Sequence, residues 1–280
     1  MRFDDRINGL FQRCVKSLCL LLLWTPATWG QMKDEGDIES ILAAGTLDPQ
    51  AESPDLKQAA DLIVQKTNAF RQEQGLKSVD PNPKLAETAQ DFADFMADSD
   101  KYGHTADGRR PAERAKAHGY EYCLISENIA YQFSSVGFAT TELAEKFTQG
   151  WIDSPGHRKN MLDPAATETG VAVAQSDKTG YFYAVQMFGR PQSASVRFAV
   201  ENQSGSDIEY TVGQRTFPLP PRYTRTHQRC REVEIVLRVP GQTDPRTKTV
   251  TPADGQKIVV TGQAGELETQ TTELQEEAIR

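Results

Sequence analysis

Hydrophobic positions between residues 55 and 151 recur three or four residues apart, the spacing of a helix that buries one face. A first helix is predicted to begin at Pro54-Asp55 and to end before Gly75. A proline followed by an acidic residue favours a helix N-terminus, and glycine favours its end. The same pattern predicts further helices at residues 82–100, 111–117 and 138–151.

Two strand-like runs follow the helices. Residues 168–175 and 181–188 are rich in valine, tyrosine and phenylalanine, and Asp177-Lys178-Thr179-Gly180 between them has the composition of a hairpin turn. Helices followed by paired strands favour an α+β layered domain. We place this domain at residues 55–190.

The pattern changes after Gly189-Arg190-Pro191. Helical periodicity ends there, and short alternating runs take its place at residues 196–201, 208–212, 224–230, 234–239 and 257–261. Such runs predict a small, sandwich-like all-β domain at residues 191–265. A core of roughly 70 residues is thin and marginally stable alone. The acidic, polar residues 266–280 predict a disordered tail.

The N-terminus has the layout of a secretory signal peptide. Arg13 and Lys16 precede the short apolar run Ser17 to Trp24, and small residues at Thr28 and Gly30 suit cleavage after Gly30. The run is shorter than the about 20 residues that a membrane-spanning helix needs. An N-terminal membrane anchor is the alternative.

We therefore expect residues 1–30 to be removed and the mature chain to be secreted, to the periplasm or to the outside, without a transmembrane segment. Residues 31–54 then form a polar linker, with one short helix around residues 38–44. Charged residues make up 25% of the chain and the net charge is −8. This composition is ordinary for a globular protein and disfavours a general nucleic-acid binder.

Two of the four cysteines, Cys123 and Cys230, lie outside the predicted signal peptide. An exported protein can oxidise such a pair, and the resulting disulfide would join the two predicted domains. Two separate thiols are the alternative, because a sequence does not give the Cα distance that a bridge requires.

Three short segments together resemble a known family. They are Tyr102-Gly103-His104-Thr105, Ser126-Glu127-Asn128-Ile129-Ala130, and the string WIDSPGHRKNML from Trp151 to Leu162. In this order they resemble the CAP superfamily of cysteine-rich secretory, antigen 5 and pathogenesis-related proteins, which share the SCP domain. The likeness is to its bacterial branch and spans roughly residues 56–190. It implies a three-layer α-β-α sandwich.

The resemblance also implies a cleft lined by two histidines and two acidic residues. His104, Glu127 and His157 correspond to three of these positions, and the fourth, a glutamate in eukaryotic members, falls on Ser154. The missing acid weakens any catalytic interpretation. We expect turns and loops, rather than helix faces, to bring the three side chains together.

Two imidazoles and one carboxylate allow several chemistries. His104, His157 and Glu127 can hold a divalent metal such as zinc. Glu127 can instead orient one histidine or act as a general base for water. The three can also form a buried polar network that only holds the segments together. Ser126 and Ser154 are candidate nucleophiles, although a hydrogen bond at a helix end explains Ser154 better.

The remaining charged groups suggest less. Arg109, Arg110 and Arg114 predict a solvated helix start, and His118 predicts a favourable charge at a helix C-terminus. His227 lies between arginines in the β region, and its context suggests no chemical role.

The favoured interpretation is a secreted SCP domain followed by a β domain, with a non-enzymatic function. The site would bind a lipid, a peptide or an envelope partner, with a divalent metal as the one expected cofactor. The first alternative is a metal-assisted hydrolase of peptide or ester bonds. The second is a structural cell-envelope module in which the β domain is the adhesive part.

Overall fold

The computed structural model describes residues 39–40, 53–241, 247–262 and 266–274. The predicted signal peptide and most of the predicted linker lie outside these residues. Within the linker, β1 (Glu39–Ser40) pairs antiparallel with β3 (Lys101–Tyr102), so these two residues form a strand instead of the predicted helix. The other residues of that predicted helix lie outside the described ranges.

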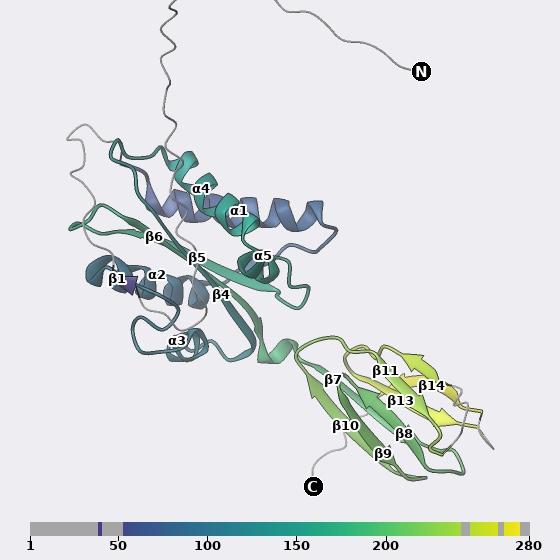
Figure 1. Cartoon of the computed structure of the whole chain (residues 1–280). Coiled ribbons are helices and arrows are strands. Elements are labelled where there is room, and N and C mark those ends of the chain that lie inside the picture. Colours follow the sequence, from purple (N-terminus) through teal and green to yellow (C-terminus); the bar gives the residue numbers. More distant parts are fainter. Residues whose placement is uncertain (1–38, 41–52, 242–246, 263–265, 275–280) are drawn as a thin grey trace, which may run out of the picture. The chain divides into compact units, whose positions relative to one another are not determined.

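Helices and strands form a layered N-terminal body (Figure 1). Its helices are α1 (Leu56–Glu73), α2 (Pro83–Ser99), α3 (Pro111–Ala117), α4 (Thr140–Asp153) and α5 (Pro155–Met161). Side-chain caps begin the first two helices, because Asp55 accepts the N–H of Gln58 and Asn82 accepts the N–H of Lys84. None of the described helices is long and apolar enough to cross a membrane.

The sheet of this body has the strand order β2 (Asp80–Pro81), β5 (Glu168–Gln175), β6 (Phe182–Pro191), β4 (Tyr122–Gln132). β5–β6 and β6–β4 are antiparallel, whereas the short β2 runs parallel to β5. The sequence pattern did not predict β4, whose residues alternate weakly between buried and half-buried.

Each face of the sheet carries its own hydrophobic core. On one face Phe147 and Trp151 of α4 pack with Ile63 of α1 against Val173. On the other face residues of α2 and α3 pack against alternate positions of the same strands, such as Ala172 and Val185. The α+β class and the three-layer α-β-α arrangement are thereby confirmed.

A second, all-β body follows η1 (Gln192–Ala194). Its strands are β7 (Val196–Asn202), β8 (Ile208–Val212), β9 (Arg215–Leu219), β10 (Thr224–Arg229), β11 (Ile235–Arg238), β12 (Lys248–Val250), β13 (Gln256–Thr261) and β14 (Glu268–Glu273). They form two sheets, β10-β7-β13-β14 and β12-β11-β8-β9, with a shared apolar core. A small all-β domain is therefore present, as predicted, while its boundary near residue 190 stays a prediction.

The prediction of a disordered tail at residues 266–280 was wrong for its first part. β14 pairs antiparallel with the whole of β13, from Gln256 opposite Glu273 to Thr261 opposite Glu268. β14 is the last strand of its sheet and is largely exposed. Exposed strands need no hydrophobic alternation, so the polar composition of this segment concealed the strand.

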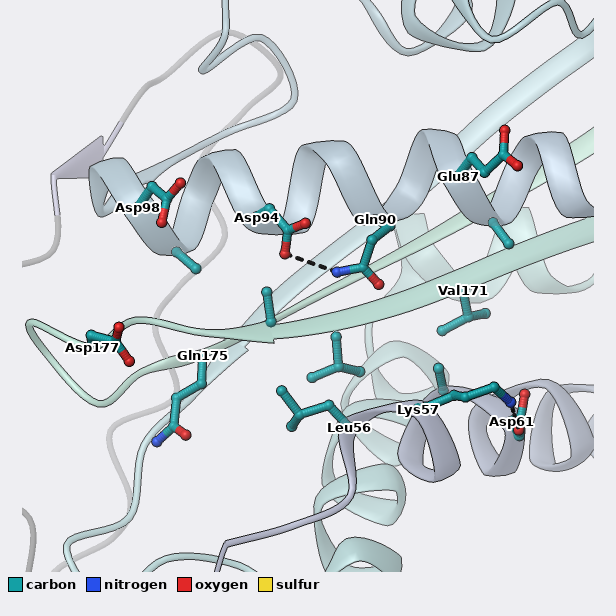
Figure 2. Close-up of a pocket in the computed structure, with 15 residues that line it drawn as sticks. Leu56, Lys57, Asp61, Glu87, Gln90, Asp94, Asp98, Val171, Gln175 and Asp177 are labelled. Carbon is teal, nitrogen blue, oxygen red and sulfur yellow. Dashed lines mark hydrogen bonds and ion pairs between the residues drawn. The ribbon is translucent and has the colours of Figure 1, made fainter.

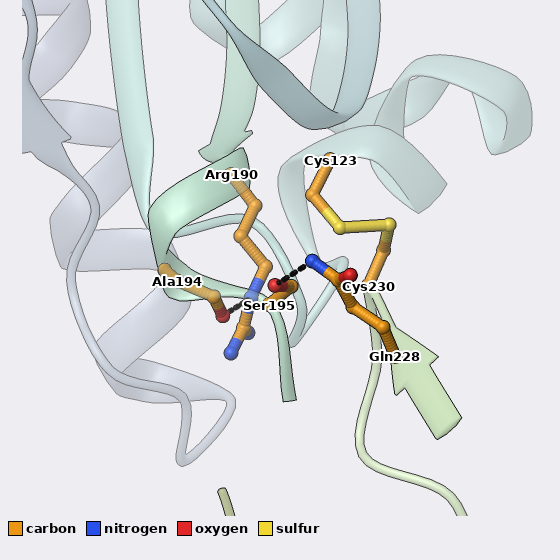
Figure 3. Close-up of a disulfide and its surroundings, with 6 residues drawn as sticks. All are labelled: Cys123, Arg190, Ala194, Ser195, Gln228 and Cys230. Atoms are coloured by element: carbon orange, nitrogen blue, oxygen red, sulfur yellow. Dashed lines mark hydrogen bonds between the residues drawn. A yellow bond between two sulfur atoms is a disulfide. The ribbon is translucent and has the colours of Figure 1, made fainter. Parts of the chain in front are cut away.

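A disulfide joins Cys123, in β4, to Cys230, directly after β10 (Figure 3). The two Cα atoms are 5.2 Å apart, within the usual range for a bridge. The neighbouring Arg231 forms an ion pair with Asp163, with Nη2 2.6 Å from Oδ2. The pair of cysteines thus links two segments 107 residues apart in the chain.

Candidate functional site

Glu127 lies near the middle of β4, opposite Met187 of β6, and its side chain is 1% exposed. The prediction that a loop presents this residue was wrong, since the sheet fixes its backbone on the β6 side. One carboxylate oxygen, Oε1, lies 2.7 Å from Nδ1 of His104. The other, Oε2, accepts a hydrogen bond of 2.6 Å from Nη2 of Arg114.

Arg114 of α3 is buried, so its prediction as part of a solvated helix start was wrong. Its Nη1 donates to Oδ1 of Asp107 at 2.8 Å, and its Nη2 also donates to the backbone oxygen of His104 at 3.0 Å. The guanidinium carbon lies 3.5 Å from the centroid of the Phe92 ring. Arg114 therefore fixes both the Glu127 carboxylate and the loop that carries His104. Arg109 and Arg110 are exposed, as predicted.

His104 follows the short strand β3 and remains partly accessible, with 32% of its side chain exposed. A loop presents it, as expected. Because Nδ1 faces the Glu127 carboxylate, that nitrogen carries the proton and the lone pair resides on Nε2. The carboxylate thus selects the tautomer of this ring.

His157 is the third residue of α5, so a short helix rather than the expected turn presents it. Its side chain is buried beside Trp151, with ring centroids 6.5 Å apart. Burial, and next the charge of His104, lower the pKa of His157 to about 4. The ring is therefore neutral at physiological pH, and its buried Nδ1 has no hydrogen-bond partner among the described residues.

Two asparagines hold α5 against β4. Nδ2 of Asn128 donates to the backbone oxygen of His157 at 3.2 Å, and Nδ2 of Asn160 donates to the backbone oxygen of Glu127 at 3.1 Å. Asn160 also donates to Oδ1 of Asn128 at 2.9 Å. The end of α5 is fixed by Arg71, whose Nη1 donates to the backbone oxygen of Met161. These contacts set the position of the His157 ring relative to Glu127.

The two candidate serines have no histidine as a hydrogen-bond partner within the described chain. Ser154 joins α4 to α5, and its backbone oxygen accepts the N–H of Arg158 at 2.8 Å. Its hydroxyl makes no capping hydrogen bond, which corrects the predicted side-chain role. The Ser126 hydroxyl is buried and unpartnered. Neither serine is thus arranged as a nucleophile activated by a base.

The arrangement offers two neutral imidazoles and one buried carboxylate. Across the described ranges, no three histidine, cysteine, aspartate or glutamate side chains are grouped closely enough to hold a metal ion. Glu127 already faces His104 and Arg114 with its two oxygens. The free lone pair of His104 and the unpartnered nitrogen of His157 are therefore the groups with capacity for a cation or a polar ligand.

A cavity of about 1030 Å³ lies elsewhere, between α1 and α2 along β5 (Figure 2). Leu56 and Asp61 of α1, Gln90 and Asp94 of α2, and Val171 of β5 are among its lining residues. The lining includes none of the four predicted site residues. The predicted histidine-lined cleft and this cavity are therefore different places.

Sequence reasoning missed three residues of the network: Asp107, Arg114 and Asn160. A helix of seven residues gives too short a periodic pattern to separate a buried arginine from an exposed one. Asn160 lies inside the WIDSPGHRKNML string, and that position was the available signal for a structural role. No local signal marked Asp107.

The N-terminal body is similar to known proteins. The family described as "Cysteine-rich secretory protein family" (CAP) matches residues 64–188. The uncharacterized protein YkwD of Bacillus subtilis (strain 168) is 31% identical over 129 residues, which are 46% of this chain and 46% of YkwD. The uncharacterized membrane protein YlbC of the same strain is 29% identical over 121 residues, which are 43% of this chain and 33% of YlbC.

A solved structure shows the same kind of partial likeness. It is an extracellular protein containing an SCP domain from Bacillus anthracis str. Ames, 27% identical, with a TM-score of 0.41. The likeness covers 48% of this chain and 41% of that one. The chain thus spans less than half the length of the curated relatives that it matches.

Proposed function

Because this chain belongs to the CAP superfamily, in its bacterial branch, we propose that it is a secreted binding protein whose site is formed by His104 and His157. The observation that carries this proposal is the ordered series Arg114–Glu127–His104, with a neutral His157 beside it. Such a series orients one imidazole and keeps its outer nitrogen available.

The two imidazoles fit a divalent cation such as zinc. His104 keeps its Nε2 lone pair because Nδ1 faces Glu127, and a carboxylate behind a histidine is the usual support of a metal ligand. His157 is neutral and has an unpartnered ring nitrogen. Bound there, a cation would act as a Lewis acid toward a polar ligand group. Two protein ligands are fewer than the three or four of known zinc sites, so the bound ligand would supply the remaining contacts.

Binding is favoured over hydrolysis by the burial of Glu127. Its side chain is 1% exposed and its two oxygens face His104 and Arg114, so bulk water does not reach the group that a hydrolase would use as base. The position of the family's fourth acidic residue is Ser154, whose hydroxyl has no basic partner within the described residues.

Zinc titration of the metal-free mature protein by calorimetry tests the proposal. His104→Ala and His157→Ala are expected to abolish binding, and Glu127→Gln to weaken it about 10- to 100-fold, the usual cost of losing a supporting carboxylate. His118→Ala is the matched control, because Nε2 of His118 also lies 3.0 Å from a carboxylate, that of Asp91. Equal weakening by the control, or no binding by the wild type, would contradict the proposal.

A purely structural network gives a different result in the same material. In that case His157→Ala lowers the melting temperature to the same extent with zinc and with chelator, and zinc does not shift the melting temperature of the wild type. The proposal requires the wild type to be stabilised by zinc and both alanine variants to lose that stabilisation, because a ligand stabilises the state that binds it.

Secretion is supported by the cysteine pair. Disulfides persist mainly in oxidising compartments, and Cys123 and Cys230 form one in this chain. The N-terminal pattern of residues 1–30 agrees with export. The partner remains a proposal of class only: a lipid, a peptide or an envelope component with a polar group for the two histidines.

A further inference from the structure

The edge strands of the β body place three arginines on the side of the strands that faces the core. Arg225 and Arg229 of β10 lie opposite Val200 and Val196 of β7, and Arg215 of β9 lies opposite Val212 of β8. Directly opposite residues of paired strands share one face of the sheet. All three valines are core residues, so the arginines occupy positions where apolar side chains are expected.

The three side chains converge on one place. The guanidinium carbons of Arg215 and Arg225 lie 5.6 and 5.2 Å from the centroid of the Phe217 ring. Nη2 of Arg229 reaches the turn between β8 and β9, 3.6 Å from where a Cβ at Gly213 would lie. β9 and β10 are the last strands of their respective sheets. We call these three residues the arginine cluster.

The cluster lacks negative partners. Among the described residues, none of its members forms an ion pair with a carboxylate, whereas Arg238 pairs with Glu209 and Lys257 with Glu201 in the same body. The adjacent His227 adds no negative charge: its Nε2 lies 2.7 Å from the hydroxyl of Tyr210. Burial, and next the charges of Arg225 and Arg229, lower the pKa of His227. Three positive charges thus face one another without compensation.

We propose that the arginine cluster binds phosphate groups of a polyanionic chain. Stacking on Phe217 covers one flat face of Arg215 and Arg225, and the N–H groups at the guanidinium edges stay available. A carboxylate has two oxygens and accommodates one or two guanidinium groups. A phosphate group has more acceptor oxygens and a larger charge, so it matches three of them. A repeating phosphate polymer would also reach the exposed Arg229.

Protection of the sheet edge is the competing explanation. Charged side chains on edge strands discourage pairing with other chains, and inward-facing charges are one known device. That role needs no ligand and no convergence on a single aromatic ring. The two explanations differ in what happens when a phosphate polymer is added.

The test is binding of the full chain to short-chain polyphosphate, measured by calorimetry at low and at moderate salt. Arg215→Gln and Arg225→Gln are each expected to weaken binding about tenfold or more, since each removes charged hydrogen bonds. Arg197→Gln is the matched control. It removes one positive charge from the exposed side of β7, in the same sheet, and should change the affinity by less than about twofold.

Each further measurement decides the proposal. Binding of inorganic phosphate alone, lost in the same variants, would support a site for single phosphate groups and contradict the polymer. Equal affinity for poly-L-glutamate, or equal weakening by Arg197→Gln, would indicate unspecific charge attraction and overturn it. No binding of polyphosphate by a folded wild type would leave edge protection as the explanation. Arg225→Lys, which keeps the charge but not the planar fork, should bind less tightly than the wild type.

Discussion

Nδ1 of His104 lies 2.7 Å from Oε1 of Glu127, which joins a partly exposed loop residue to a carboxylate buried in the sheet. The second oxygen of that carboxylate accepts from Arg114, and Arg114 also holds the backbone of His104. One arginine therefore supports both members of the pair. The orientation of His104 depends on a residue that does not itself reach the solvent.

Removing Arg114 is expected to destabilise the fold strongly. In Arg114→Ala the buried Glu127 carboxylate loses its positive partner, and breaking a buried pair costs about 3–5 kcal/mol. Urea unfolding of the two proteins measures the free-energy difference. Arg110→Ala, which breaks the exposed pair with Glu113, is the control and should leave the free energy of unfolding almost unchanged. An equal effect of both variants would contradict the buried role of Arg114.

The stability of the protein is expected to fall as the pH is lowered from about 6.5 to 4. His157 has a folded-state pKa of about 4, whereas a histidine in the unfolded chain titrates near pH 6.5. Between these values the unfolded chain binds more protons, so protonation favours unfolding. The full difference is roughly 3 kcal/mol. It is measured by urea unfolding across this pH range with chelator present, and His157→Gln should flatten the dependence. An unchanged slope in that variant would assign the effect to other groups.

Loss of the disulfide is expected to lower the free energy of unfolding by about 2–5 kcal/mol, because the bridge restricts the unfolded chain over a separation of 107 residues. The Cys123→Ser, Cys230→Ser double variant tests this. Alkylation of the mature wild type without reductant should add no mass, and alkylation after reduction should add two labels. Two labels without reductant would show free thiols.

Gly170→Ala is expected to destabilise the N-terminal body by about 3 kcal/mol or more. A Cβ at this position in β5 would lie 2.1 Å from the backbone nitrogen of Ala86, and the backbone of α2 has little freedom to move. Gly156→Ala is the control, because nothing lies within 4 Å of a Cβ there and alanine suits the helix α5. Thermal unfolding distinguishes the two. Similar melting temperatures would contradict the close approach of α2 and β5.

The mature N-terminus is expected at or near Gln31, because Thr28 and Gly30 suit cleavage after Gly30. N-terminal sequencing of the exported protein from a native host checks this. A soluble cytoplasmic protein that starts at Met1 would contradict export.

The sequence by itself determined the local elements that have strong periodicity and clear ends. The caps at Asp55 and Asn82, the helix from Pro111 to Ala117 and the strand from Glu168 to Gln175 appear where the pattern places them. The three motif segments also indicated the family and the three-layer fold. These features depend on neighbouring residues, so a linear pattern contains them.

Tertiary structure alone decided what the polar residues do. Arg114 and Arg110 lie four residues apart in similar surroundings in the chain, yet one is buried against Glu127 and the other is exposed. β4 and β14 were concealed because pairing, rather than alternation, makes them strands. The convergence of Arg215, Arg225 and Arg229 needs the register of two sheets. Contacts between residues far apart in the chain settle burial and charge pairing, and a linear sequence does not contain those distances.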